Sequence, residues 1–276
     1  MNIQTALLQG QRLLDDARVS APRLTAEVLL AHAIGCERAW LFAHSDEELR
    51  EVWWIHYGRY LHERMQGKPT QYITGRQEFY GREFHVTPAV LIPRPETEHS
   101  IEAALALCGA GLWPAILDIG TGSGAIGITL SLETRAYVVG TDISEAAVRL
   151  AAKNAHRLGS SAQFVVCDLG SSFASGAFDI VVCNPPYVPG ADKENVQREV
   201  RDHEPPIAVF GGLDGLEVYR RLIPEAARLL KPGGHLVMEI GYLAAAAVSA
   251  MLGEWTNVEI KPDLAGIPRV IIATHP

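Results

Sequence analysis

Apolar residues recur with two different periods along the 276-residue chain. In the first 66 residues they return every three or four positions, which is typical of helices with one buried face. The pattern predicts a helix over residues 2–18, and Ser20 is placed to cap a second one. Ser45 to Glu48 has the spacing of a capping box that opens a third helix. Residues 1–66 are therefore predicted to form a small helical bundle domain.

The helical period stops at residues 67–92, where glycine and proline separate short β-like pieces. These pieces are residues 71–73, 78–80 and 83–86, and they predict a β-hairpin linker. A further helix is predicted over residues 98–107.

From about residue 115, short apolar runs alternate with amphipathic helical segments. The predicted strands are 115–119, 136–140, 163–167, 179–183, 235–240, 256–260 and 269–274. The predicted helices between them are 124–132, 145–158, 215–230 and 243–252. This alternation predicts an α/β fold in residues 93–276, a doubly wound, mostly parallel seven-stranded sheet with helices on both faces. The short spacing of the last two strands favours a reversed strand near that edge.

Composition narrows the function classes. The net charge is −8, which argues against nonspecific binding to DNA or RNA because that binding depends on basic patches. The four cysteines are scattered, and neither a signal-peptide pattern nor an apolar run of 18 residues is present. We expect reduced thiols, a cytoplasmic location and no membrane contact. No histidine or cysteine cluster has metal-ligand spacing, so no metal is expected.

A glycine-rich loop follows the first strand of the predicted sheet. Asp118 precedes Gly120, Thr121, Gly122, Ser123 and Gly124, and a helix begins directly afterwards. Such glycines let the backbone approach a ligand, and the helix N-terminus offers free N–H groups. Asp142 ends the second strand, where a carboxylate can accept both hydroxyls of a ribose.

A dinucleotide site is the natural alternative, since Gly122, Gly124 and Gly127 match G-x-G-x-x-G. Three features weigh against it. Glycines alternate with small hydroxyl residues from Gly120 onward, which suits an amino-acid tail better than a pyrophosphate. Asp118 could meet an ammonium group but would repel phosphate. The turn after the fourth strand has no use in hydride transfer.

That turn is Asn184-Pro185-Pro186-Tyr187, and it follows the apolar run Phe178 to Cys183. The Asn184 side-chain carbonyl and the Pro185 carbonyl can accept both hydrogens of an –NH2 group, and the prolines stiffen the loop. The Tyr187 ring can stack on the flat face of the group being held. The carboxyl ends of the strands share one crevice, so Asn184 is expected to face the glycine loop.

Together these residues resemble a class I S-adenosylmethionine (AdoMet)-dependent methyltransferase that acts on an amino or amide nitrogen. Four further segments are similar to those of the HemK/PrmC family, which methylates glutamine N5 of peptide-chain release factors. They are Gln71–Gly75, Glu78–Gly81, Leu91–Glu98, and Glu204-Pro-Pro with Gly211–Gly215. The resemblance covers nearly the whole chain, including the helical N-terminal domain.

The resemblance implies a role for each matching residue. Gly120 to Gly124 would hold the methionine part of AdoMet, Asp142 the ribose, and Asp168 with Leu169 the adenine. The family can place Trp at the position of Leu169, so a smaller side chain would cover the adenine here. Asn184, which also borders the cofactor, Pro185, Pro186 and Tyr187 would hold the glutamine of the release factor's Gly-Gly-Gln loop. Asn184, Pro185 and Tyr187 would carry the catalysis by positioning and electrostatics, leaving S-adenosylhomocysteine as product.

Two other functions fit parts of the pattern. An adenine-N6 methyltransferase of DNA or RNA would use the same turn for a flipped base, although the net charge of −8 opposes it. A noncatalytic scaffold with the same fold would need neither the glycine loop nor the Asn184 turn. Arg94 and Glu96, just before the core domain, are either at the rim of the crevice or in an exposed salt bridge.

Overall fold

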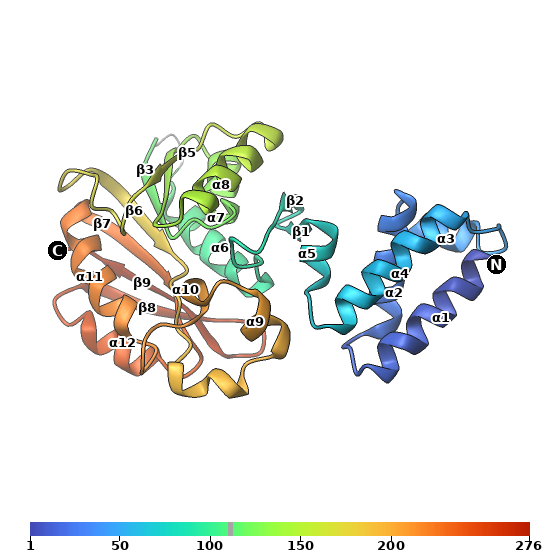
Figure 1. The fold of residues 1–276 in the computed structure, drawn as a ribbon. Helices are drawn as coiled ribbons and strands as arrows, with labels where there is room; N and C mark the ends of the chain where they lie inside the picture. Colours follow the sequence, from blue (N-terminus) through green and yellow to red (C-terminus); the bar gives the residue numbers. More distant parts are fainter. Residues whose placement is uncertain (110–112) are drawn as a thin grey trace. The chain divides into compact units, whose positions relative to one another are not determined.

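The computed structural model describes residues 1–109 and 113–276, which form two compact units. The first comprises Met1–Arg76 with Gln197–His203, and the second comprises Gln77–Val196 with Glu204–Pro276. Figure 1 traces both along the chain. A short segment from the C-terminal half therefore belongs to the N-terminal unit.

The first unit is helical. Its helices are α1 (Ile3–Asp16), α2 (Pro22–Ile34), α3 (Arg38–Ala43), α4 (Glu51–Met65), α5 (Thr70–Thr74) and α9 (Arg198–His203). Leu14, Leu29, Leu30, Tyr57 and Leu61 form the centre of its apolar core and are almost inaccessible to solvent. The helical period of the sequence is thus explained by one buried cluster.

Two predicted helix starts are wrong. The helix after residue 45 begins at Glu51 rather than within the capping-box pattern, because that segment caps a different helix. The carbonyls of Ser45 and Glu47 accept hydrogen bonds from the N–H groups of Gln4 and Ile3, at the start of α1. The second helix begins at Pro22, and no side chain caps it, Ser20 included.

The predicted linker is partly helical. Residues 71–73, expected to be extended, lie in α5. The hairpin itself is present as β1 (Arg76–Phe79) and β2 (Arg82–His85), and its Phe79 and Phe84 are buried in the second unit's core. Tyr72 is buried and Ile73 packs against the first unit's apolar core, and local β propensity does not reveal these contacts.

The second unit is built on a seven-stranded sheet with the order β5-β4-β3-β6-β7-β9-β8. The strands are β3 (Ala115–Ile119), β4 (Tyr137–Asp142), β5 (Gln163–Val166), β6 (Phe178–Cys183), β7 (Leu230–Glu239), β8 (Thr256–Pro262) and β9 (Pro268–Thr274). The first five in the order are parallel, and β9 runs antiparallel to both of its neighbours. The predicted doubly wound α/β fold is confirmed, and the reversed strand lies next to the edge.

Helices cover both faces of this sheet (Figure 1). The helices packed on it are α6 (Glu98–Leu107), α7 (Ala125–Glu133), α8 (Glu145–Leu158), α11 (Glu217–Leu229) and α12 (Ala245–Met251). The unit also contains α10 (Pro206–Val209) and the 3₁₀ turns η1 (Pro95–Thr97) and η2 (Gly190–Asn195). One core lies under α6, α7 and α8, and the other under α11 and α12. Strands buried on both sides explain the near-continuous apolar runs of the sequence. Among the described residues, no helix is long and apolar enough to cross a membrane.

Candidate functional site

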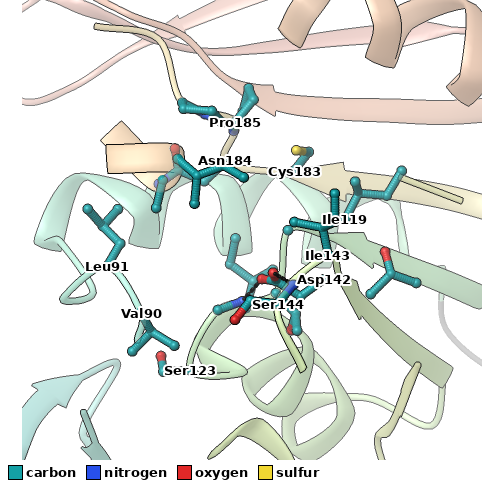
Figure 2. A pocket seen from close by; sticks show the side chains of 18 of the residues that line it. Val90, Leu91, Ile119, Ser123, Asp142, Ile143, Ser144, Cys183, Asn184 and Pro185 are labelled. Atoms are coloured by element: carbon teal, nitrogen blue, oxygen red, sulfur yellow. Dashed lines mark hydrogen bonds between the residues drawn. The ribbon is translucent and has the colours of Figure 1, made fainter. Parts of the chain in front are cut away.

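A pocket lies at the carboxyl ends of the parallel strands of the second unit. β4 and β5 lie on one side of β3, and β6 and β7 lie on the other, so the order of the strands along the chain reverses at this point. Its lining residues come from segments 89–97, 119–126, 141–144, 167–169, 183–186 and 205–221. In Figure 2, Asn184 and Pro185 lie above Asp142 and Ser144, with Val90 and Leu91 at the side. Ligands of open α/β sheets bind at this kind of switch point.

The glycine loop after β3 is fixed by its own backbone. The N–H groups of Gly120 and Thr121 both donate to the carbonyl of Thr141, each at 2.8 Å. Gly120 has φ +74°, and a Cβ built there would meet nothing within 4 Å, so this part of the loop is open to the pocket. Gly120 to Ser123 line the pocket.

Gly124 has a different place. It is the N-cap of α7 with φ +84°, and a Cβ there would lie 2.6 Å from Ile128 Cδ1. It is not among the described residues that line the pocket. Its contribution is the tight entry into α7, which lets the loop before it face the ligand.

Asp142 lies at the end of β4 and lines the pocket. One carboxylate oxygen accepts the N–H of Gly122 at 3.0 Å, and the other accepts the N–H of Ser144 at 2.9 Å. A carboxylate has about four acceptor positions, so each oxygen keeps one for a ligand hydroxyl. The side chain is oriented by the loop and remains able to hold a vicinal diol.

Asp118 does not face the pocket, and the expectation that it could meet a ligand's ammonium group is not supported. Its side chain is fully buried, with one oxygen accepting from Thr121 Oγ1 at 2.6 Å and from the Gly127 N–H at 2.9 Å. Burial raises the pKa of Asp118 to about 6. Asp118 therefore holds the glycine loop against α7.

The third wall consists of Cys167, Asp168 and Leu169, after β5. Arg221 Nη2 donates to Asp168 Oδ2 at 2.5 Å, and this pair is half-exposed. Leu169 has φ +50°, unusual for a branched side chain, and packs partly against the apolar core while lining the pocket.

Asn184 is the first residue after β6 and lines the pocket with Pro185 and Pro186. Its side-chain Nδ2 donates to Thr97 Oγ1 at 3.0 Å. Thr97 in turn donates to Glu239 Oε2 at 2.6 Å. The amide of Asn184 is therefore anchored on its nitrogen side.

Tyr187 lies behind this turn and not among the described pocket-lining residues. Its hydroxyl donates to Glu239 Oε1 at 3.2 Å, and its ring packs on Gly241, where a Cβ would be 3.0 Å from Cδ2. Burial raises the pKa of Tyr187 well above its usual value, and the nearby Glu239 carboxylate adds to that shift. In this structure the ring supports the turn rather than forming a pocket wall.

Arg94 is at the rim and is paired, but its partner is Glu204 and not Glu96. The guanidinium donates to Glu204 Oε1, and the N–H of Ile92 donates to Oε2 at 3.1 Å. The Glu204 side chain is 1% exposed. This buried carboxylate holds the Leu91 to Arg94 stretch against the pocket, so the exposed salt bridge considered above is wrong.

Three residues of this arrangement are absent from the sequence-based prediction: Thr97, Glu204 and Glu239. Thr97 and Glu204 lie within segments quoted for the family resemblance, but nothing local indicates their partners. Glu239 follows an apolar strand run, where a carboxylate is a signal for a buried hydrogen-bonded group.

Charge further defines the pocket. The two described lining cations, Arg94 and Arg221, are both neutralised by carboxylates. Asp142 remains able to accept further hydrogen bonds, so the pocket suits a cationic or hydroxyl-rich ligand better than a pyrophosphate. Fold and site together define a class I AdoMet-dependent methyltransferase.

Comparisons with known proteins agree on this class. Residues 5–75 match the family model of the PrmC N-terminal domain, and residues 114–261 match a methyltransferase domain. A Pyrococcus furiosus methyltransferase structure superposes with a TM-score of 0.52 at 18% identity, covering 71% of this chain and 90% of that one. The T. thermophilus 16S rRNA methyltransferase RsmC, solved with AdoMet and guanosine, gives 0.55 at 24% identity, with 73% and 50% covered. These structures show the fold alone.

Sequence relatives are more specific. A release factor glutamine methyltransferase of Koribacter versatilis is 46% identical, covering 100% of this chain and 99% of its own. Proteins of the same name from Nitratidesulfovibrio vulgaris and Moorella thermoacetica are each 41% identical, with 98% and 99% of this chain covered and 94% and 98% of theirs. The chain belongs to the release factor glutamine methyltransferase family.

Proposed function

We propose that this enzyme transfers a methyl group from AdoMet to the side-chain amide nitrogen of the glutamine in the Gly-Gly-Gln loop of class I release factors. The names of its relatives support the substrate. The observation that carries the proposal is Asn184, anchored through its nitrogen at the end of β6 and lining the same pocket as Asp142 and the glycine loop.

The residues present fit AdoMet. Gly120 to Ser123 offer open backbone for the methionine part, and Asp142 has an acceptor position on each oxygen for the ribose hydroxyls. Asp168 and Leu169 line the third wall, where the adenine would lie. The loop from Gly120 to Gly124 would be completed by Gly124, which shapes the entry into α7. When bound, AdoMet supplies a methyl group already activated by its sulfonium.

The chain's own residues then act on the amide. An amide nitrogen is a weak nucleophile because its lone pair is delocalised. Acceptors at Asn184 Oδ1 and the Pro185 carbonyl would hold both amide hydrogens, orient the nitrogen and stabilise the positive charge it gains. Pro186 keeps the turn stiff, and Tyr187 supports it from behind. The proton leaves afterwards, from the more acidic methylated product.

The test is mass spectrometry of a purified release factor after incubation with the enzyme and AdoMet. We expect one added methyl group on the Gly-Gly-Gln glutamine and a rate reduced about 10²-fold or more in Asn184→Ala, by analogy with other preorganised hydrogen-bonding groups. Asn195→Ala, at an exposed position of η2, is the matched control and should be unaffected.

The result that would overturn the proposal is an unmodified release factor in the presence of enzyme that binds AdoMet by calorimetry. Methylation of an adenine-containing oligonucleotide in a parallel reaction would then identify the nucleic-acid alternative.

A cytoplasmic location is also proposed, since none of the cysteines, all of which the structure describes, is in a disulfide.

A further inference from the structure

A buried carboxylate lies behind the proposed substrate-holding turn. Glu239 is the last residue of β7 and is 1% exposed. The strands β6 and β7 are parallel neighbours with Cys183 opposite Met238, which brings the residues that follow, Asn184 and Glu239, to adjacent strand ends. A charge buried this deeply needs partners to be tolerated.

Its partners are two hydroxyls, one on each carboxylate oxygen. Thr97 donates to Oε2 at 2.6 Å, and Tyr187 donates to Oε1 at 3.2 Å. The backbone carbonyl of Glu239 accepts from the buried Tyr219 hydroxyl at 3.0 Å. The Glu239 side chain is therefore hydrogen-bonded both to Thr97, which lines the pocket, and to Tyr187 of the turn.

Thr97 links Glu239 to Asn184 and determines how the Asn184 amide is oriented. A hydroxyl has one proton to donate, and the 2.6 Å contact commits that proton to the carboxylate. Toward Asn184 the same oxygen can only accept. The group at 3.0 Å must therefore be the Asn184 –NH2, which leaves Asn184 Oδ1 as the free acceptor.

We propose that Glu239 and Thr97 are positioning residues that set the polarity of the Asn184 amide, so that the pocket presents an acceptor to the substrate. This inference rests on the proposed function. The relay is the chain of hydrogen bonds from Glu239 through Thr97 to Asn184, and Glu239 lies 142 residues from Thr97 in the sequence. We assign to this relay the recognition of an –NH2 group, as opposed to a carboxylate or hydroxyl acceptor.

Removing the relay would reverse that polarity. Without the carboxylate, the Thr97 proton is free to point at Asn184, and the amide can turn so that its own –NH2 faces the substrate's –NH2. Two donors facing each other cannot bond, and each loses a partner in a partly buried site. In its ionised form the carboxylate also polarises the chain of hydrogen bonds and makes Asn184 Oδ1 a stronger acceptor.

Burial raises the pKa of Glu239 above its usual value, and most of the contacts around the carboxylate oppose that rise. Arg269 acts on it favourably and is itself paired with Asp263 at 2.9 Å, while Glu96 acts against it. The hydroxyls of Thr97 and Tyr187 stabilise the ionised form directly.

The first test is the pair Thr97→Val and Thr97→Ser. Valine keeps the shape but removes the hydroxyl, and we expect kcat for release factor methylation to fall about 10²-fold. Serine restores the hydroxyl and should recover most of the rate. The AdoMet dissociation constant should change little in either. Valine also removes a donor from the buried Glu239 carboxylate, so its melting temperature should fall. Measuring kcat at a temperature at which circular dichroism shows each variant to be folded separates positioning from folding.

The second test is a cycle of Glu239→Gln with Asn184→Ala. We expect Glu239→Gln alone to lower kcat about tenfold, because glutamine can still accept from Thr97 but carries no charge. In the Asn184→Ala background the same change should have no further effect, since the relay has no end group. Additive effects, or Thr97→Val with a normal kcat, would overturn the proposal.

A third readout does not depend on the substrate. A neutron structure of the enzyme should show deuterons on the Asn184 nitrogen facing Thr97 and the Thr97 deuteron facing Glu239. A Thr97 deuteron directed at Asn184 would overturn the relay even if the release factor is methylated. The predicted deuterons with no release factor methylation would instead contradict only the proposed function.

Discussion

The number of hydrogen bonds that a side chain can donate or accept limits its role in this protein. Thr97 has one proton, so its bond to Glu239 decides what it offers Asn184. Asp142 has acceptor positions to spare after fixing the loop, so it remains available to a ligand. Asp118 is buried with one oxygen bonded and the other without a described partner, so it acts on the loop alone.

Asp118 makes stability depend on pH. Its pKa is raised from 3.8 to about 6 by burial, so between these values the folded state binds more protons than the unfolded state. The ionised form is disfavoured by folding, and stability at this site therefore falls as pH rises from about 4 to 6 and is regained on acidification. A shift of about two pKa units corresponds to about 3 kcal/mol.

Asp118→Asn removes this titration, since the side chain stays neutral. The free energy of unfolding of the native protein, measured by urea denaturation at intervals between pH 7 and pH 4, should rise relative to that of the variant by up to about 3 kcal/mol. Parallel pH profiles of the two proteins would contradict the assignment. Asp214→Asn, at an exposed position, is the control. The pKa of Asp214 is lowered, so this carboxylate changes the free energy of unfolding only at more acid pH.

Elements show where sequence reasoning succeeds and where it stops. The alternating sheet is predictable because each strand and helix has its own apolar period, and the glycine loop and Asn184 turn follow strand ends. α9 is not predictable, since Arg198–His203 has no apolar period and is held by distant partners. The Ser45 pattern misleads for the opposite reason, because a local capping signal is overridden by long-range bonds to α1.

The functional site divides in the same way. Site residues that belong to a local sequence motif can be predicted from the sequence. Thr97, Glu204 and Glu239 cannot, because each acts through partners far away in the sequence. The Glu204 carboxylate, for example, binds the Ile92 N–H across 112 residues. Spacing along the chain contains no record of that contact.

The Leu91 to Arg94 stretch depends on Glu204 for its place in the pocket wall. Glu204→Ala removes the acceptor of both Ile92 N–H and Arg94, and we expect AdoMet affinity to fall about tenfold with a loss of stability of about 2–3 kcal/mol. Glu204→Gln keeps an acceptor for Ile92 and should fall between that variant and the native protein. Calorimetry with AdoMet measures the effect, and unchanged affinity in Glu204→Ala would show that the stretch does not shape the site.

The whole chain passes between its two units three times, after Arg76, Val196 and His203. The two later crossings place α9 in the first unit, where Arg64 Nη2 lies 2.9 Å from Glu199 Oε2 and Arg198 Nη2 donates to the Gln66 carbonyl at 3.0 Å. The Arg64 side chain is 8% exposed, so its charge depends on this partner. The N-terminal unit is thus completed by residues that follow the catalytic turn.

Breaking that ion pair should therefore release α9. In Glu199→Ala the buried Arg64 charge loses its partner, and we expect the free energy of unfolding to drop by about 2 kcal/mol, a value reduced for the partial exposure of Glu199. Trypsin should then cut faster after Arg198 and Arg201, which limited proteolysis with mass spectrometry would detect. Adding Arg64→Met removes the unpaired charge, so the double variant should be more stable than Glu199→Ala alone. Equal stability of the two, with unchanged cleavage of α9, would mean that the helix is held by other contacts and that the first unit does not depend on this pair.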